Sequence, residues 1–153
     1  DIPKYNSATG ATEAIKSEAW TIAKHEGYLD AMSYYPGRAV FANILPGFDD
    51  WTKEWGDGVE RVIPRSTGLI QGQFSGAASL RNSGKPVAGI HLLTWDDWAE
   101  GTQWEPTTTE GVVYIDRMTT EIANYYGEAI STGDTAAFTD VFNNYGKLRD
   151  CPI

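Results

Sequence analysis

Three carboxylates follow a run of apolar residues near the middle of the chain. Asp96, Asp97 and Glu100 belong to the segment IHLLTWDDWAEGTQWEP, residues 90–106. Side chains three positions apart in a helical turn lie on the same side, with about 5–6 Å between their Cβ atoms. We therefore expect Asp97 and Glu100 to share one pocket. Mutual repulsion and burial there would raise the pKa of one of the two carboxyls.

Tryptophans surround these carboxylates, because Trp95, Trp98 and Trp104 belong to the same segment. Their flat faces suit sugar rings, and Thr102 and Gln103 supply polar groups for sugar hydroxyls. A protonated carboxyl beside an ionised one is what hydrolysis of a glycosidic bond requires, without metal or organic cofactor. The alternative is an acidic turn that caps a helix or faces solvent. The preceding strand and the enclosing tryptophans favour the catalytic interpretation.

Short apolar runs that precede polar residues predict two buried strands, at 38–45 and 87–93. Apolar residues at helical spacing predict helices at 9–28, 67–80 and 113–130, ended near Gly27, Gly84 and Gly133, and a last helix that begins at Asp134. Residues 28–37 read as a connection and residues 51–67 as a surface excursion. This order predicts an α/β domain over residues 1–153 with parallel strands joined through helices. Two parallel strands leave both edges open, so we expect further strands upstream or on another chain.

Other polar residues are candidates for the same site. Asp49 and Asp50 follow the first predicted strand, where they either bind substrate hydroxyls or form a turn. Arg65 is expected to hold a carboxylate of the acid pair or a sugar oxygen. Trp51 and Trp55 either cover the edge of the core or stack on sugars.

His91 lies within the second strand and is expected to be a satisfied core residue. Cys151 has no neighbouring base that would activate it.

The composition argues against several kinds of partner. Twelve Lys and Arg against 21 Asp and Glu give a net charge of −9, which disfavours nucleic acid and anionic membranes. No run reaches the ~18 apolar residues that span a bilayer. Two histidines and one cysteine far apart do not form a usual zinc site. A site for calcium or magnesium made of carboxylates alone stays open, although no EF-hand spacing is present.

The segment TWDDWAEGTQWEP, residues 94–106, resembles the signature of glycoside hydrolase families 71 and 99. Its Asp97 matches the TWNDYGES-like run of the family 71 α-1,3-glucanases, and its EGTQxEP tail matches the FNEWHEGTQIEP-like run of the family 99 endo-mannosidases. PGFDD, residues 46–50, resembles a PGxDD-like segment of the family 99 group. Arg65 falls where those enzymes have an arginine before a helix. The matches span about residues 38–130, and the 13-residue signature carries most of the specificity.

The resemblance implies a (β/α)8 barrel that acts on α-linked glycans, a fold of about 250 residues. The chain would then be the C-terminal part of such a barrel, incomplete by itself. Glu100 would be the general acid, or acid/base, and Asp97 its partner. Because Asp97 is one methylene shorter than the family 99 glutamate, we expect inversion. Asp96 replaces the usual Asn, and Ala99 replaces Gly or His. The extra carboxylate either raises the pKa of Glu100 further or reflects a loss of catalysis.

The carboxylate pair thus predicts a glycoside hydrolase, and the resemblance implies that it acts on α-linked polysaccharide or glycan and is located outside the cell or at its surface. The alternative is a non-catalytic glycan-binding or structural barrel module within a larger surface or virus assembly. A plain protein-interaction surface ranks last, since clustered carboxylates are costly to desolvate without basic partners.

Overall fold

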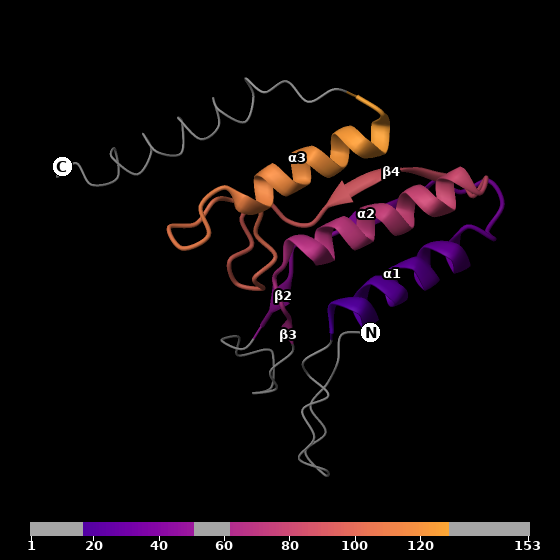
Figure 1. Cartoon of the computed structure of the whole chain (residues 1–153). Helices are drawn as coiled ribbons and strands as arrows, with labels where there is room; N and C mark the ends of the chain where they lie inside the picture. Colours follow the sequence, from indigo (N-terminus) through magenta and orange to yellow (C-terminus); the bar gives the residue numbers. More distant parts are fainter. Residues whose placement is uncertain (1–16, 51–61, 129–153) are drawn as a thin grey trace, which may run out of the picture.

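The computed structural model describes residues 17–50 and 62–128 (Figure 1). The predictions for residues 9–16, Trp51, Trp55, the helix at Asp134 and Cys151 lie outside these residues. The elements follow one another as α1 (Glu18–Met32), β1 (Val40–Ile44), β2 (Phe48–Asp49), β3 (Val62–Ile63), α2 (Thr67–Asn82), β4 (Val87–Leu92) and α3 (Val113–Tyr126).

β1 and β4 pair in parallel, with Ile44 opposite Leu92, and α2 connects them. This confirms the predicted parallel α/β arrangement of the two strands. The helices cover one face of the pair, and α2 lies between α1 and α3 (Figure 1). Apolar side chains from all three helices and both strands form one core, which includes Leu29, Ala42, Ile44, Ile70, Phe74, Val87, Trp104 and Tyr125.

No described helix covers the other face of the pair. Along β1, Val40, Ala42 and Ile44 are buried, whereas Phe41 and Asn43 are exposed. His91 lies opposite Asn43, is exposed, and its Nδ1 lies 3.0 Å from Asn43 Oδ1. The prediction of a core position for His91 was therefore wrong. The period of two in a strand places residue 91 on the face that the helices leave uncovered.

α1 and α2 approach closely because glycines of α2 face α1. A Cβ atom on Gly72 would lie 2.1 Å from Cδ1 of Ile22, and one on Gly76 would lie 2.5 Å from Cγ of Glu26. The two glycines are four residues apart, as are their partners, so the same sides of the helices meet over successive turns. The glycines that interrupt the apolar pattern of α2 thus permit helix packing.

Two helix ends differ from the prediction. Gly27 does not end α1, which continues to Met32. A helical glycine costs only about 1 kcal/mol relative to alanine, and burial of Leu29 in the core offsets that cost. α3 ends at Gly127, which adopts a left-handed conformation with φ of 73°, and not in the region of Gly133. Gly127 therefore supplies the C-terminal stop of α3, six residues before the predicted one.

A small antiparallel pair was not predicted. β2 pairs with β3, with Phe48 opposite Ile63 and Asp49 opposite Val62, where the sequence indicated only a surface excursion. Phe48 and Ile63 form a second apolar cluster with Leu69. Strands of two residues are too short to produce an alternating pattern.

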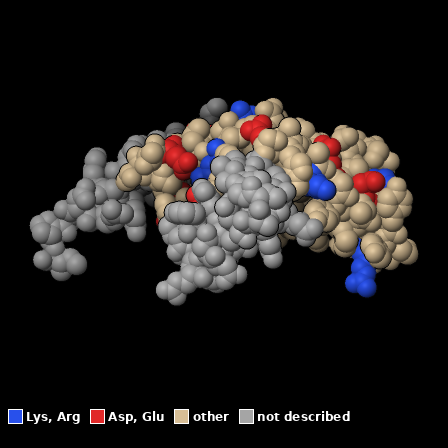
Figure 2. Space-filling model, turned by 90° about the horizontal axis from the view of Figure 1, so that it is seen from below, with Lys and Arg blue, Asp and Glu red and all other residues tan. Residues whose placement is uncertain are grey.

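The surface in Figure 2 carries acidic and basic side chains interspersed among neutral ones, and this face of the described residues shows no continuous basic patch. In the part of the chain that the structure describes, no helix is long and apolar enough to cross a bilayer. The three helices and two small sheets of this part are compatible with a section of a barrel. The complete barrel stays a prediction.

Candidate functional site

The segment after β4 folds back on itself and projects a short turn. Leu93 continues the strand pairing by donating its N–H to Ile44 O at 2.9 Å. Thr94 donates its N–H to Thr102 O at 3.1 Å, and its carbonyl accepts from Trp104 N–H at 3.0 Å. The hydroxyls of Thr94 and Thr102 lie 2.8 Å apart. Residues 95–101, called here the acidic turn, are therefore closed at their base and lie at the C-terminal end of β4.

Asp97 and Glu100 are held together within the acidic turn. Asp97 Oδ1 accepts the backbone N–H of Glu100 at 3.1 Å, and the Asp97 carbonyl accepts from Thr102 N–H at 3.2 Å. Both residues are partly buried, whereas Asp96 is exposed. The three-residue spacing thus joins Asp97 to the backbone of Glu100 and leaves Asp96 at the surface, whereas a pocket shared by the two carboxyl groups stays a prediction.

The tryptophans of the segment divide into two kinds. Trp95 and Trp98 expose 51% and 52% of their area, and the Trp98 indole N–H donates to Glu105 Oε2 at 2.9 Å. Trp104 is only 2% exposed, belongs to the main core, and donates its indole N–H to Leu93 O at 2.8 Å. Trp95 and Trp98 therefore present apolar area at the acidic turn, whereas Trp104 anchors the base of the segment.

The Arg65 side chain holds residues 101–103 in place through hydrogen bonds. Its Nη1 donates to Gly101 O at 2.7 Å, its Nη2 to Gln103 O at 3.0 Å, and its Nε to Glu110 Oε1 at 3.3 Å. The guanidinium also lies over the ring of Tyr114, 4.5 Å from its centroid. Its described hydrogen bonds reach two backbone carbonyls and Glu110, and none of these acceptors belongs to the predicted acid pair. Arg65 therefore positions the acidic turn.

Glu110 and Tyr114 were not predicted as members of the site. Burial raises the pKa of the Tyr114 hydroxyl, the Glu110 carboxylate raises it further, and Arg65 partly opposes both effects. Glu110 comes at the end of a polar loop whose pattern shows no sign of its distant partner Arg65. Only the folded arrangement brings these residues together.

The PGFDD segment also reaches the acidic turn. Asp49 donates its backbone N–H to Glu100 O at 2.7 Å. Gly101 makes this approach possible, because its φ is 63° and a Cβ atom there would lie 3.1 Å from Asp49 N. Asp49 is exposed beside the turn, whereas Asp50 is fully buried. The structure therefore brings Asp49 to the predicted site and places Asp50 inside the protein.

Two further predicted residues are buried beneath the acidic turn. Thr102 is 5% exposed and Gln103 is 7% exposed. Gln103 Oε1 has no hydrogen-bond partner among the described residues. A buried amide oxygen without a partner is costly, so this atom requires a donor from a ligand, from water or from further protein.

The described residues contain no group of three or more His, Cys, Asp and Glu side chains arranged to hold a metal ion. Comparisons of the chain with models of protein families, with curated proteins and with solved structures found no match.

Proposed function

We propose that the chain belongs to a glycoside hydrolase that cleaves α-linked polysaccharide or glycan and works outside the cell or at its surface. One observation carries the proposal: Asp97 and Glu100 lie in one turn at the C-terminal end of a parallel strand, joined by the hydrogen bond from the Glu100 N–H to Asp97 Oδ1, beside two half-exposed tryptophans. The C-terminal ends of parallel strands are where α/β enzymes carry their catalytic groups. The resemblance of residues 94–106 to two hydrolase signatures supports the same chemistry.

The two carboxyls divide the reaction between them. Glu100 donates its proton to the glycosidic oxygen as the bond to the anomeric carbon breaks. Asp97 accepts a proton from the water that attacks this carbon from the opposite face, so the product has inverted configuration. Asp97 Oδ1 already holds the Glu100 N–H, which leaves Oδ2 as the atom that accepts the proton from water.

Substrate contacts come from the surface around the pair. Trp95 and Trp98 offer flat apolar faces to sugar rings, and Asp49 offers a carboxylate to sugar hydroxyls. Gln103 Oε1 accepts a hydrogen bond from a hydroxyl of the substrate, which satisfies that buried oxygen. Trp104 and Asp50 support this surface from inside.

The proposal includes a (β/α)8 barrel of which this chain forms the C-terminal part. The open face of the β1–β4 pair supports it, because Phe41, Asn43 and His91 are exposed on the side that would line a barrel. Further strands would complete both this face and the substrate site.

The test is hydrolysis of α-glucan and α-mannan panels by the complete protein and by three matched amide variants. Asp97→Asn and Glu100→Gln are expected to lower kcat by about 10³-fold or more, since each removes a proton-transfer group. Asp96→Asn is the control, because it removes a neighbouring exposed carboxylate and should retain activity within about tenfold. Equal activity of Asp97→Asn, Glu100→Gln and the unaltered protein would refute the proposal.

A second function is favoured by the contact between Asp97 Oδ1 and the Glu100 N–H, because a carboxylate that caps a turn can be retained for structure alone. In that case the acidic turn belongs to a non-catalytic module that binds glycan. Such a module would retain soluble α-glucan or α-mannan on an affinity gel without releasing reducing ends. Detection of new reducing ends, abolished by Glu100→Gln, would exclude this second function.

A further inference from the structure

The Arg65 side chain is enclosed beside the acidic turn, from its Cγ atom to its guanidinium. A Cβ atom on Gly47 would lie 2.4 Å from Arg65 Cγ, so the connection from β1 to β2 passes directly over the aliphatic part of the side chain. The guanidinium lies over the Tyr114 ring, and the side chain is only 17% exposed. Arg65 is therefore confined, and its positive charge stays beside the turn.

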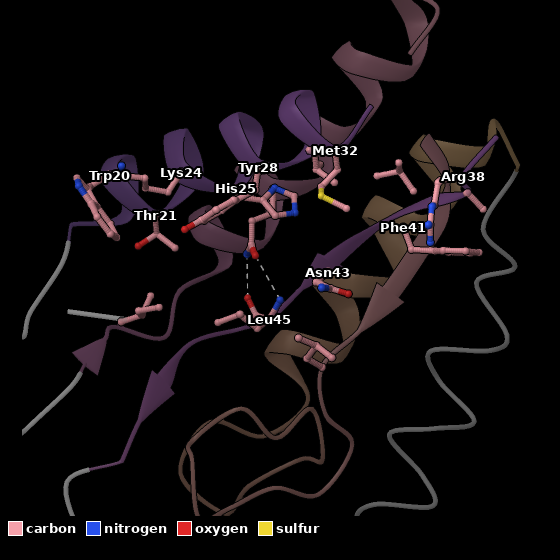
Figure 3. A pocket seen from close by; sticks show the side chains of 16 residues that line it. Trp20, Thr21, Lys24, His25, Tyr28, Met32, Arg38, Phe41, Asn43 and Leu45 are labelled. Atoms are coloured by element: carbon pink, nitrogen blue, oxygen red, sulfur yellow. Dashed lines mark hydrogen bonds between the residues drawn. The ribbon is translucent and has the colours of Figure 1, made fainter. Parts of the chain in front are cut away.

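The connection that carries Gly47 is itself held in place. Leu45 donates its N–H to Gln73 Oε1 at 3.3 Å and accepts from Gln73 Nε2 at 2.9 Å, as the two dashed lines in Figure 3 show. The Pro46 carbonyl accepts the Ser66 N–H at 3.1 Å. These bonds tie residues 45–47 to α2 and to its N-cap, so the space around the arginine is fixed from both sides.

This arrangement places a fixed cation next to the proposed proton donor. Arg65 Nη1 donates to the carbonyl of Gly101, the residue that directly follows Glu100. A nearby positive charge favours the ionised form of a carboxyl and lowers its pKa, and the effect is stronger where water is excluded. The charge of Arg65, if uncompensated, would therefore favour loss of the proton that Glu100 needs as a general acid.

The other charged or titratable groups at the acidic turn come from four parts of the chain. Among the described residues they are Asp96, Asp97 and Glu105 from the segment itself, Asp49 and Asp50 from β2 and the position after it, Glu110 from the loop before α3, and Tyr114 from α3. Arg65 is thus the only cation of this set, and Glu110 is the carboxylate that pairs with it.

Glu110 supplies the compensating charge from a closed loop. Its Oε1 accepts from Arg65 Nε at 3.3 Å, and its side chain is 27% exposed. Thr107 N–H donates to Gly111 O at 3.3 Å and Gly111 N–H to Thr107 O at 2.8 Å. Thr107 Oγ1 accepts the Glu110 N–H at 2.7 Å, and Gly111 has a φ of 59°, a left-handed conformation that suits glycine. The backbone of Glu110 is therefore fixed with its carboxylate against the guanidinium.

The opposing effects of the two charges are evident at Tyr114. Burial raises the pKa of the Tyr114 hydroxyl, the negative charge of Glu110 raises it further, and the positive charge of Arg65 lowers it. A neighbouring group is thus affected by the difference between the two charges and not by the full charge of Arg65. Glu100, next to the carbonyl that Nη1 contacts, is exposed to the same two charges.

We infer that Glu110 is a positioning residue of the acid pair, which holds Arg65 against the acidic turn and neutralises its charge so that Glu100 keeps its proton. The inference rests on the proposed function for the role of Glu100 as proton donor. It assigns to Glu110 a part in proton transfer that acts through Arg65, without contact between Glu110 and the substrate.

The chain contains a second ion pair that serves as a comparison. Arg117 Nη1 donates to Glu121 Oε1 at 3.0 Å within α3. Glu121 lies about 10 Å farther along the helix than Tyr114, at a rise of about 1.5 Å per residue. This pair stabilises one helix, whereas the pair of Arg65 and Glu110 joins positions 45 residues apart and contacts the acidic turn.

The experiment compares three variants of the complete protein. Glu110→Gln keeps an oxygen that accepts from Arg65 Nε but has no charge, whereas Glu110→Ala removes both the acceptor and the charge. Glu121→Gln is the matched control, because it neutralises the carboxylate of the Arg117 pair. Carbon-13 NMR of labelled glutamate side chains follows the titration of Glu100, whose signal is identified by its absence in Glu100→Gln. Amide hydrogen exchange reports how firmly the turn is held.

We expect Glu100 in Glu110→Gln to titrate at least about half a pH unit lower than in the unaltered protein, which is an about threefold weaker affinity for its proton. The turn amides of this variant should exchange at the unaltered rate. In Glu110→Ala the same downward shift should come with at least about tenfold faster exchange of the Thr102 and Trp104 amides, whose bonds close the turn. Glu121→Gln should change neither property.

Three results would overturn the inference. They are an unchanged titration of Glu100 in Glu110→Gln, unchanged exchange of the turn amides in Glu110→Ala, and a shift of Glu100 in Glu121→Gln as large as that in Glu110→Gln. In the last case the effect would follow from total charge and not from the compensation of Arg65.

A kinetic measurement separates this inference from the proposed function. The alkaline limb of kcat/KM against pH reports the pKa of the acid in the free enzyme, so it should move to lower pH in Glu110→Gln by the amount that NMR measures for Glu100. A complete protein that shows the expected titration but hydrolyses no α-glycan refutes the proposed function and leaves the charge compensation by Glu110 standing. Hydrolysis with an alkaline limb that does not move in Glu110→Gln overturns the inference and leaves the proposed function standing.

Discussion

Replacing Arg65 by lysine should loosen the acidic turn while retaining the positive charge. Arg65 makes hydrogen bonds of 2.7 and 3.0 Å to two carbonyls and one of 3.3 Å to Glu110, with a side chain that is 17% exposed. A lysine ammonium is compact and lacks the planar fork, so we expect it to replace one of these three bonds. Loss of the other two, at about 1–1.5 kcal/mol each, lowers the free energy of unfolding by about 2–3 kcal/mol.

Two measurements test this expectation. Urea unfolding reports the global loss, and amide hydrogen exchange reports whether the amides of Thr94, Thr102 and Trp104 open more readily than those of β1. In the complete protein, a turn displaced by about 1 Å would also lower kcat/KM by about 100-fold.

Arg81→Lys is the matched control. Arg81 likewise lies over a tyrosine ring, that of Tyr125, at 4.4 Å from the centroid, but it is on the exposed side of α2, away from the acidic turn. Its replacement should change stability by less than about 1 kcal/mol and leave the turn amides unaffected. If Arg65→Lys and Arg81→Lys have the same unfolding midpoint and the same turn exchange rates, Arg65 does not hold the turn.

Three further changes test other parts of the structure. The folded chain keeps the pKa of His25 near 4, whereas an unfolded histidine titrates near 6.5, so protons bind the unfolded state more readily between these two pH values. Lowering the pH from 7 to 5 should therefore reduce the free energy of unfolding by up to about 2 kcal/mol more in the unaltered chain than in His25→Leu, as measured by urea unfolding at both pH values. Gly72→Ala should destabilise the folded chain by about 1–3 kcal/mol, because the added methyl group clashes with Ile22. Gly27→Ala has open space around it and should stabilise the folded chain by up to about 1 kcal/mol. Thermal unfolding that ranks the two variants the other way would contradict the α1–α2 packing. Trp98→Ala in the complete protein should weaken binding of the α-glycan at least tenfold by loss of about 1.4 kcal/mol of stacking, measured by calorimetry, and unchanged affinity would remove Trp98 from the site.

Local patterns in the sequence predict the elements of this fold well where one face meets a core. The runs at 38–45 and 87–93 are strands within one or two residues, and residues 67–80 are helical with the predicted start. The spacing of Asp97 and Glu100 also places both residues in one turn, because a turn is a local structure. These features depend on neighbours in the sequence, which a single chain displays directly.

Long-range contacts are what the sequence does not display. Arg65 reaches carbonyls 36 and 38 residues away, and no pattern distinguishes a backbone acceptor from a substrate acceptor. Trp104 differs from Trp95 and Trp98 only by where the segment folds back, so its burial is a property of the closed loop. His91 was misplaced because an apolar run does not show which of its two faces is covered.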